Sequence, residues 1–220
     1  MCPIPCNTMN KNVCIYGGSF DPITYAHEMV LVEVSNLNWI DEIWVVICRC
    51  RDDKDLAAFE HRYNMFSLIM NNNTSNMLKN KIFIKDLECK DATTPTYDLL
   101  KTQKERYPNY TFYFTIGSDL LNDIFNWDNG EELVLENNFI IVERGNYNID
   151  ENVLKKFPKY YLIKIENMSF VNYISSSDTR KILTKKNDFE DLKKYTHPIV
   201  IDYIKKYNLY DYNVGYPTMG

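Results

Sequence analysis

The chain has 220 residues, of which 45% are hydrophobic, and this length suits a single domain with one sizeable core. Its formal net charge of −5 argues against a nucleic-acid coat protein, which needs a basic surface to displace counterions. The chain has no apolar run of the roughly 20 residues that a membrane span needs, and its first residues lack the apolar core of a secretion signal. We therefore expect a cytoplasmic protein that binds neither membranes nor nucleic acid.

Short runs rich in β-branched and aromatic residues alternate with helical patterns along the chain. The expected strands are Val13–Tyr16, Glu42–Cys48, Ile82–Lys85, Tyr110–Ile116, Phe139–Val142 and Tyr160–Ile165. Apolar residues recur at helical spacing over 26–37, 59–70 and 200–207, whereas Tyr97–Tyr107 is compatible with a helix or an irregular crossing. The alternation predicts an α/β fold with a Rossmann-like, doubly wound parallel sheet and further helices at the C-terminal end.

The segment GGSFDPITYAH, residues 17–27, joins the first expected strand to the first helical pattern. Gly17 and Gly18 allow a sharp turn and a close approach of the backbone to a ligand, and Ser19 adds a hydroxyl donor. His27 falls just inside the helix start, where free backbone N–H groups and the helix dipole attract phosphate. Alternatively, the glycines only form a turn and His27 is a hydrogen-bonded residue of the core. The combination of the glycine turn with a histidine at a helix start nevertheless predicts an anion site.

Two further features indicate the same edge of the sheet. Gly117 and Gly145, like Gly17, follow expected strands, and such sheets bind ligands at the carboxyl ends of their strands. Near the far end of the chain, ISSSDTR, residues 174–180, offers serines suited to cap a helix, with Arg180 one turn inside it. Alone, this segment is typical of a serine-capped surface helix. Together with the first motif it predicts a clamp on a polyphosphate such as that of ATP.

Six segments in register resemble the nicotinate mononucleotide adenylyltransferases of the (H/T)xGH nucleotidyltransferase superfamily. GGSFDPITYAH resembles the (H/T)xGH signature, and ISSSDTR resembles the ISSTxIR motif. PTYDLL is similar to the family's YTxDTL, FTIGSDLLNDIFNW to its GxDxL…W segment, FIIVERG to the next strand with its RxG end, and HPIVIDYIKKYNLY to the closing PxxVxxYIxxxxLY. The resemblance covers most of residues 12–210. It implies one nucleotidyltransferase domain over residues 1–220, in which we expect 1–11 and 211–220 to be flexible tails.

The resemblance implies adenylyl transfer from ATP to nicotinate mononucleotide, which yields nicotinate adenine dinucleotide and pyrophosphate in NAD biosynthesis. Such transfers need positioning and charge stabilisation more than covalent catalysis. We expect Mg²⁺ to accompany ATP, held by substrate and water rather than by a metal site of the protein. The six cysteines show no paired CxxC spacing, so we expect no zinc site either.

The same resemblance assigns roles to individual residues. His27, assisted by Thr24 and by the backbone of residues 18–20, is expected to bind the reacting phosphates, and Arg180 with Ser177 is expected to stabilise the β,γ-phosphates. The residues expected to bind ATP are Gly17, Gly18, Ser19, Phe20, Gly117, Asp119, Ser176 and Ser177.

The mononucleotide is expected to contact Thr96, Trp127 and Lys54. The Trp127 ring offers a flat apolar face on which a pyridine ring can stack, and Thr96 offers a hydroxyl and a backbone donor for a carboxylate. Lys54 lies between Arg51 and Arg62 at the place of the family's basic loop, although the usual PPHK sequence is absent.

The chain departs from the family pattern at Thr24, in place of the first histidine of HxGH, and at Ala26, in place of glycine. Thr24 can donate a hydrogen bond but cannot carry a charge. The departures leave open phosphopantetheine adenylyltransferase, which shares the TxGH form, another (H/T)xGH nucleotidyltransferase, and a non-catalytic nucleotide-binding module. Redox use of bound NAD is disfavoured because the GxGxxG turn is missing. Preference for the acid or the amide mononucleotide, and homo-oligomerisation, are left open.

Overall fold

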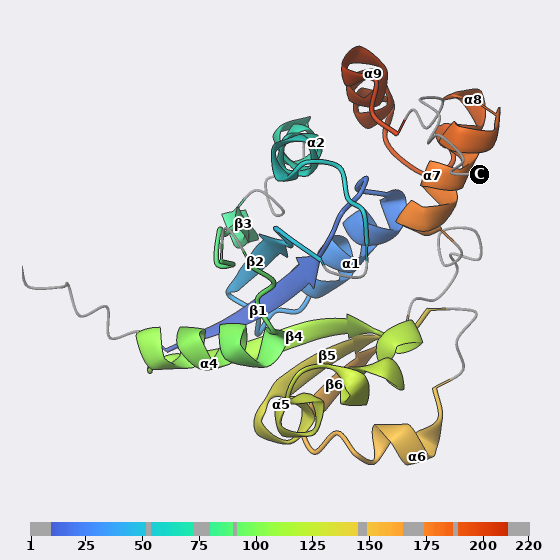
Figure 1. Ribbon diagram of the computed structural model, residues 1–220. Helices are drawn as coiled ribbons and strands as arrows, with labels where there is room; N and C mark the ends of the chain where they lie inside the picture. Colours follow the sequence, from blue (N-terminus) through green and yellow to red (C-terminus); the bar gives the residue numbers. More distant parts are fainter. Residues whose placement is uncertain are drawn as a thin grey trace, which may run out of the picture.

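A computed structural model describes residues 10–51, 54–72, 80–89, 92–144, 149–164, 174–186 and 189–210 of the protein. The described residues form a six-stranded sheet in the order β3-β2-β1-β4-β5-β6, and every neighbouring pair is parallel (Figure 1). The strands are β1 (Lys11–Gly18), β2 (Glu42–Ile47), β3 (Ile82–Ile84), β4 (Tyr110–Gly117), β5 (Asn138–Val142) and β6 (Tyr160–Ile163). The predicted parallel sheet is confirmed.

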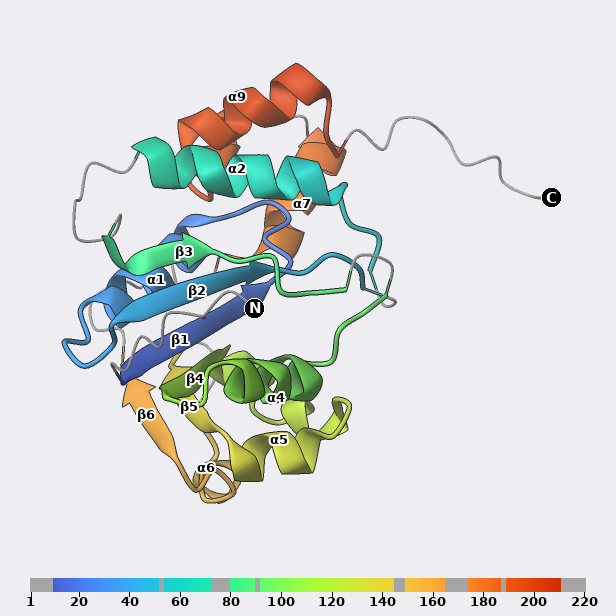
Figure 2. The same ribbon diagram turned by 90° about the vertical axis from the view of Figure 1, so that its left-hand side faces the viewer.

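Helices cover both faces of this sheet. They are α1 (Tyr25–Ser35), α2 (Phe59–Asn72), α4 (Thr96–Arg106), α5 (Gly130–Glu136), α6 (Glu151–Leu154), α7 (Ser176–Lys186), α8 (Phe189–Leu192) and α9 (Pro198–Tyr207), with the 3₁₀ helices η1 (Ser118–Leu120) and η2 (Asp123–Asn126). In Figure 2, α2 and α9 lie above β3, and α4 and α5 lie in front of β4 and β5. Two buried clusters correspond to the two faces. Because successive strand residues point to opposite faces, Cys14 belongs to the first cluster and Ile15 to the second.

The element boundaries agree closely with the sequence pattern. The ambiguous segment Tyr97–Tyr107 forms helix α4, whose bounds are Thr96–Arg106. Strand β1 begins at Lys11, inside the segment expected to be a tail, and the Lys11 ammonium pairs with Glu42 of β2. Residues 1–9 and 211–220, the remainder of the expected tails apart from Asn10, lie outside the described residues.

The sheet has its topological switch point between β1 and β4. From β1 the chain continues through β2 to β3 on one side, and from β4 it continues through β5 to β6 on the other. Doubly wound sheets bind ligands outside the carboxyl ends of the strands at this point. Those ends are Gly18 of β1 and Gly117 of β4. No helix in the described ranges is long and apolar enough to cross a membrane.

Candidate active site

A tight loop, residues 19–24, leads from β1 into α1. Phe20 has a φ of 48°, in the left-handed region, and its buried ring packs edge-on against His27 with ring centroids 5.0 Å apart. A Cβ atom on Gly18 would lie 3.1 Å from the Phe20 ring. Glycine at 18 therefore lets the loop fold back closely onto the end of the strand, as the sequence motif predicts.

The imidazole of His27 is fixed by Thr24, the N-cap residue of α1. Nδ1 of His27 accepts the backbone N–H of Thr24 at 3.0 Å and lies 2.9 Å from Thr24 Oγ1. A backbone N–H can only donate, so the neutral ring carries its hydrogen on Nε2. Burial, together with the nearby charge of Arg144, lowers the pKa of His27 to about 3. His27 is therefore a neutral hydrogen-bond donor.

The structure places Thr24 in contact with His27. Its side chain is fully buried and its hydroxyl faces His27 Nδ1. Thr24 thus fixes the orientation of the imidazole of His27. The expected assistance of Thr24 in phosphate binding stays a prediction.

The start of α7 packs against the loop that follows β1, although the two segments are far apart in the sequence (Figure 1). Ser176 Oγ donates to the Pro22 carbonyl at 2.9 Å, and Arg180 Nη1 donates to the Asp21 carbonyl at 2.6 Å. Arg180 Nη2 donates to Ser177 Oγ at 3.3 Å. The motifs GGSFDPITYAH and ISSSDTR are therefore neighbours, in contact at residues 21 and 22.

Asp119 lies at the carboxyl end of β4, in η1, where its carboxylate accepts a hydrogen bond from Arg144 Nη1 at 3.1 Å. A Cβ atom on Gly117 would lie only 2.3 Å from Asp119 Oδ1. The carboxylate can occupy this place only because residue 117 is glycine. Gly145, the third glycine expected at a strand end, lies outside the described residues.

Arg144 is a site residue to which the sequence analysis gave no role, although it lies in the segment FIIVERG. It follows β5, its backbone N–H donates to Ser118 Oγ at 2.9 Å, and its Nη2 donates to the Ile174 carbonyl at 2.8 Å. It therefore links the ends of β4 and β5 to the residues that precede α7. The available signal was its place one residue before Gly145, after a strand that we expected to end at the binding edge.

The basic segment after β2 divides into a structural and an exposed part. Arg62 is only 1% exposed, and its guanidinium donates to the carbonyls of Ser19, Cys48, Arg49 and Ala57. It ties the loop after β1 to the loop after β2, so it is a buried brace rather than part of a basic nucleotide-binding loop. Lys54 is exposed.

The residues expected around the mononucleotide lie in connections that leave the carboxyl ends of three strands. Lys54 follows β2, Thr96 begins α4 after β3, and Trp127 follows η2 after β4. Trp127 Nε1 donates to Asp123 Oδ2 at 3.1 Å, while part of the ring packs on the buried cluster between α5 and the sheet. The indole is therefore held in one orientation. The shared contact of these residues with a mononucleotide stays a prediction.

Comparisons with known proteins agree with this geometry. The cytidylyltransferase-like family model matches residues 15–182. A probable nicotinate-nucleotide adenylyltransferase of Acholeplasma laidlawii is 31% identical over 84% of this chain and 93% of its own length. Nicotinate-nucleotide adenylyltransferase of Bacillus subtilis is 29% identical over 64% of this chain and 73% of its own.

Two solved structures are more similar still. Plasmodium falciparum nicotinic acid mononucleotide adenylyltransferase complexed with NaAD is 68% identical, with a TM-score of 0.88, over 93% of this chain and 100% of that one. A second structure, the P. falciparum enzyme complexed with APC, is 67% identical, with a TM-score of 0.86, over 93% of this chain and 100% of that one. The chain belongs to the cytidylyltransferase-like family and, within it, to the nicotinate-nucleotide adenylyltransferases.

Proposed function

We propose that this protein transfers the adenylyl group of ATP to nicotinate mononucleotide, as a step of NAD biosynthesis. The observation that carries the proposal is that two helix starts, that of α1 with His27 and that of α7 with Arg180, lie against the same loop after β1, at the switch point of the sheet. Family membership favours this reaction over phosphopantetheine as acceptor and over a non-catalytic module. A cytoplasmic location stays a prediction, and homo-oligomerisation stays open.

In this reaction an oxygen of the mononucleotide phosphate attacks the α-phosphorus of ATP. A new P–O bond forms, the bond from the α-phosphorus to the bridging oxygen breaks, and pyrophosphate leaves. Catalysis then consists of holding the two phosphates in line and stabilising the charge that moves onto the leaving group. We infer that ATP enters as its magnesium complex, in which the ion offsets charge on the phosphates.

The chain supplies hydrogen-bond donors of two kinds for this task. Nε2–H of His27 is a neutral donor, and the ring stays uncharged throughout the physiological range because its pKa is lowered to about 3. Arg180 supplies a cation that is 20% exposed at the start of α7. We assign the neutral donor to the reacting phosphates and the cation to the leaving pyrophosphate, where charge accumulates.

On the ATP side, Asp119 is suited to accept hydrogen bonds from ribose hydroxyls at the end of β4. Arg144 holds that carboxylate in place and neutralises it at 3.1 Å. The backbone at Gly17, Gly18, Ser19 and Phe20, with Ser176 and Ser177, completes the proposed ATP site.

On the acceptor side, the indole of Trp127 is proposed to stack on the pyridine ring, with Thr96 and Lys54 beside it. Replacing Trp127 by alanine should raise the KM for the mononucleotide and leave the KM for ATP nearly unchanged, because the ring touches only the acceptor. Replacing it by phenylalanine keeps a flat ring and should restore most of the affinity. Equal changes of both KM values in the alanine variant would contradict stacking.

The function is tested by incubating the purified protein with ATP and Mg²⁺ and measuring pyrophosphate and dinucleotide by chromatography. Nicotinate mononucleotide, nicotinamide mononucleotide and phosphopantetheine are compared as acceptors. We expect pyrophosphate release that depends on nicotinate mononucleotide, and a loss of about 100-fold or more in His27→Ala. Pyrophosphate release with phosphopantetheine alone, or with no acceptor, would overturn the proposal.

A further inference from the structure

Tyr210, the last residue that the structure describes, reaches back to the loop after β1. Its Oη donates to Asp21 Oδ1 at 2.6 Å, across 189 positions of the chain. The backbone of Tyr210 is left-handed, with a φ of 66°, and so is that of Asn208, with a φ of 49°. Residues with large side chains rarely adopt this conformation, and tyrosine does so only where its surroundings hold it. The contact with Asp21 is therefore a specific feature of Tyr210.

Asp21 connects this phenol to the start of α7. Its side chain is 1% exposed, and its Oδ2 lies 3.6 Å from Arg180 Nη1, which also donates to the Asp21 carbonyl at 2.6 Å. A carboxylate so deeply buried needs partners to remain ionised. Burial raises the pKa of Asp21, and the hydrogen bond from Tyr210 and the charge of Arg180 oppose that rise. Asp21 thus contacts both the phenol of Tyr210 and the guanidinium of Arg180.

We propose that Tyr210 is a positioning residue for adenylyl transfer, which acts through Asp21 to hold the Arg180 guanidinium toward the phosphates. The proposal rests on the role proposed above for Arg180. A guanidinium has five N–H donors. Within the described residues, the hydrogen bonds of Arg180 use one N–H of Nη1 and one of Nη2, so donors remain for an anion. Without the phenol, Oδ1 of Asp21 loses its donor. The carboxylate then turns to Arg180, the cation at 3.6 Å, and draws it away from the phosphates.

The test compares Tyr210→Phe with Tyr203→Phe. Tyr203 is a matched control, because it lies on α9 and its phenol also makes hydrogen bonds, to Asn64 at 3.0 Å and to His61 at 3.1 Å, away from Asp21. We expect Tyr210→Phe to lower kcat/KM for ATP about tenfold, the usual order for one lost hydrogen bond to a charged group. Tyr203→Phe should stay within about twofold of the parent. Equal losses in the two variants overturn the proposal.

A positioning role is separated from a structural one by repeating the comparison in an Arg180→Ala background. Tyr210→Phe should then cause no further loss of kcat/KM, because its effect passes through Arg180. A loss by the same factor in both backgrounds means that Tyr210 only supports the fold, and overturns the proposal. If Tyr210→Phe does not fold, Asp21→Asn takes its place in the same design. It should lower kcat/KM in the parent and not in Arg180→Ala, and any other result overturns the proposal.

The same data distinguish this proposal from the proposed function. Dinucleotide formation by the parent protein together with a large loss in Arg180→Ala supports the function, whatever Tyr210→Phe shows. A parent protein without dinucleotide formation contradicts the function itself. Near-normal turnover in Arg180→Ala removes the role of Arg180, and the role of Tyr210 with it.

Discussion

Replacing His27 by glutamine is expected to make the protein less sensitive to acid. Burial and the charge of Arg144 lower the pKa of His27 to about 3, from an ordinary value of 6.5. In the unfolded chain the imidazole takes up a proton below pH 6.5, whereas in the folded protein it does so only near pH 3. The unfolded state therefore binds more protons throughout this window. The free energy of unfolding must fall as the pH falls through it.

The size of the effect follows from the two pKa values. Between pH 7.5 and pH 5 this group alone should lower the free energy of unfolding by about 2 kcal/mol. Glutamine cannot titrate, and at the third helical position its side-chain oxygen can accept the Thr24 N–H as the imidazole does. Glu28 acts in the opposite sense, because burial raises its pKa to about 7. That contribution is common to both proteins and cancels in the comparison.

The assay is urea unfolding of the parent and of His27→Gln at the two pH values, followed by tryptophan fluorescence. The parent should lose about 2 kcal/mol more than the variant on going from pH 7.5 to pH 5. Equal losses in the two proteins would mean that the imidazole takes up its proton freely in the folded state. The assignment of a neutral Nε2–H donor would then be wrong.

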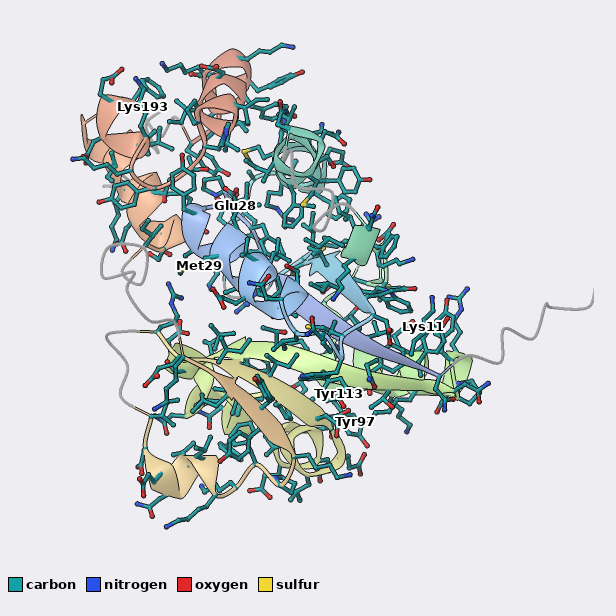
Figure 3. All side chains as sticks on the ribbon, turned by 180° about the vertical axis from the view of Figure 1, so that it is seen from behind. Lys11, Glu28, Met29, Tyr97, Tyr113 and Lys193 are labelled. Atoms are coloured by element: carbon teal, nitrogen blue, oxygen red, sulfur yellow. The ribbon has the colours of Figure 1, made fainter. Side chains whose placement is uncertain are left out.

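Three further substitutions test other parts of the structure. Arg62→Met should lower the free energy of unfolding by about 3–5 kcal/mol, because the change leaves four carbonyls without their donor. Urea unfolding measures this loss, and a value below about 1 kcal/mol would contradict the bracing role of Arg62. Gly117→Ala should displace the Asp119 carboxylate and raise the KM for ATP as much as Asp119→Ala does, with little change in Tm; an unchanged KM would exclude the ribose contact. Glu28, in the first turn of α1 next to α7 (Figure 3), has Oε1 buried without a hydrogen-bond partner among the described residues. Ionising this carboxyl group in the folded state is costly because its pKa is raised to about 7. Glu28→Gln should therefore raise the free energy of unfolding by up to about 3 kcal/mol at pH 8 and by little at pH 4.5. Equal gains in stability at the two pH values would contradict the raised pKa of Glu28.

The sheet could be predicted from the sequence because its central strands are short apolar runs that end in glycine. Val13–Tyr16 and Tyr110–Ile116 carry β-branched and aromatic residues over several positions, a pattern typical of a strand buried on both faces. The pairing of the GGSFDPITYAH and ISSSDTR motifs was also predictable, because each carries the residues of a helix start that binds anions.

The parts that escaped prediction depend on contacts between distant segments. The sequence cannot show whether an arginine such as Arg62 is exposed or buried against carbonyls, because only the folded loops bring those carbonyls together. Arg144 reaches the Asp119 carboxylate only because β5 pairs with β4, which brings the end of β5 beside the end of β4. The hydroxyl of Thr24 could reach phosphate or His27 equally well until the helix start was built.

The central claim is that His27 and Arg180 act on the same triphosphate. A crystal structure of the protein with a non-hydrolysable ATP analogue tests it most directly. We predict that Nε2 of His27 and the guanidinium of Arg180 both lie within hydrogen-bond distance of the phosphates of one nucleotide, at the carboxyl ends of β1 and β4. A nucleotide bound elsewhere, or one that only one of the two side chains contacts, would contradict the claim.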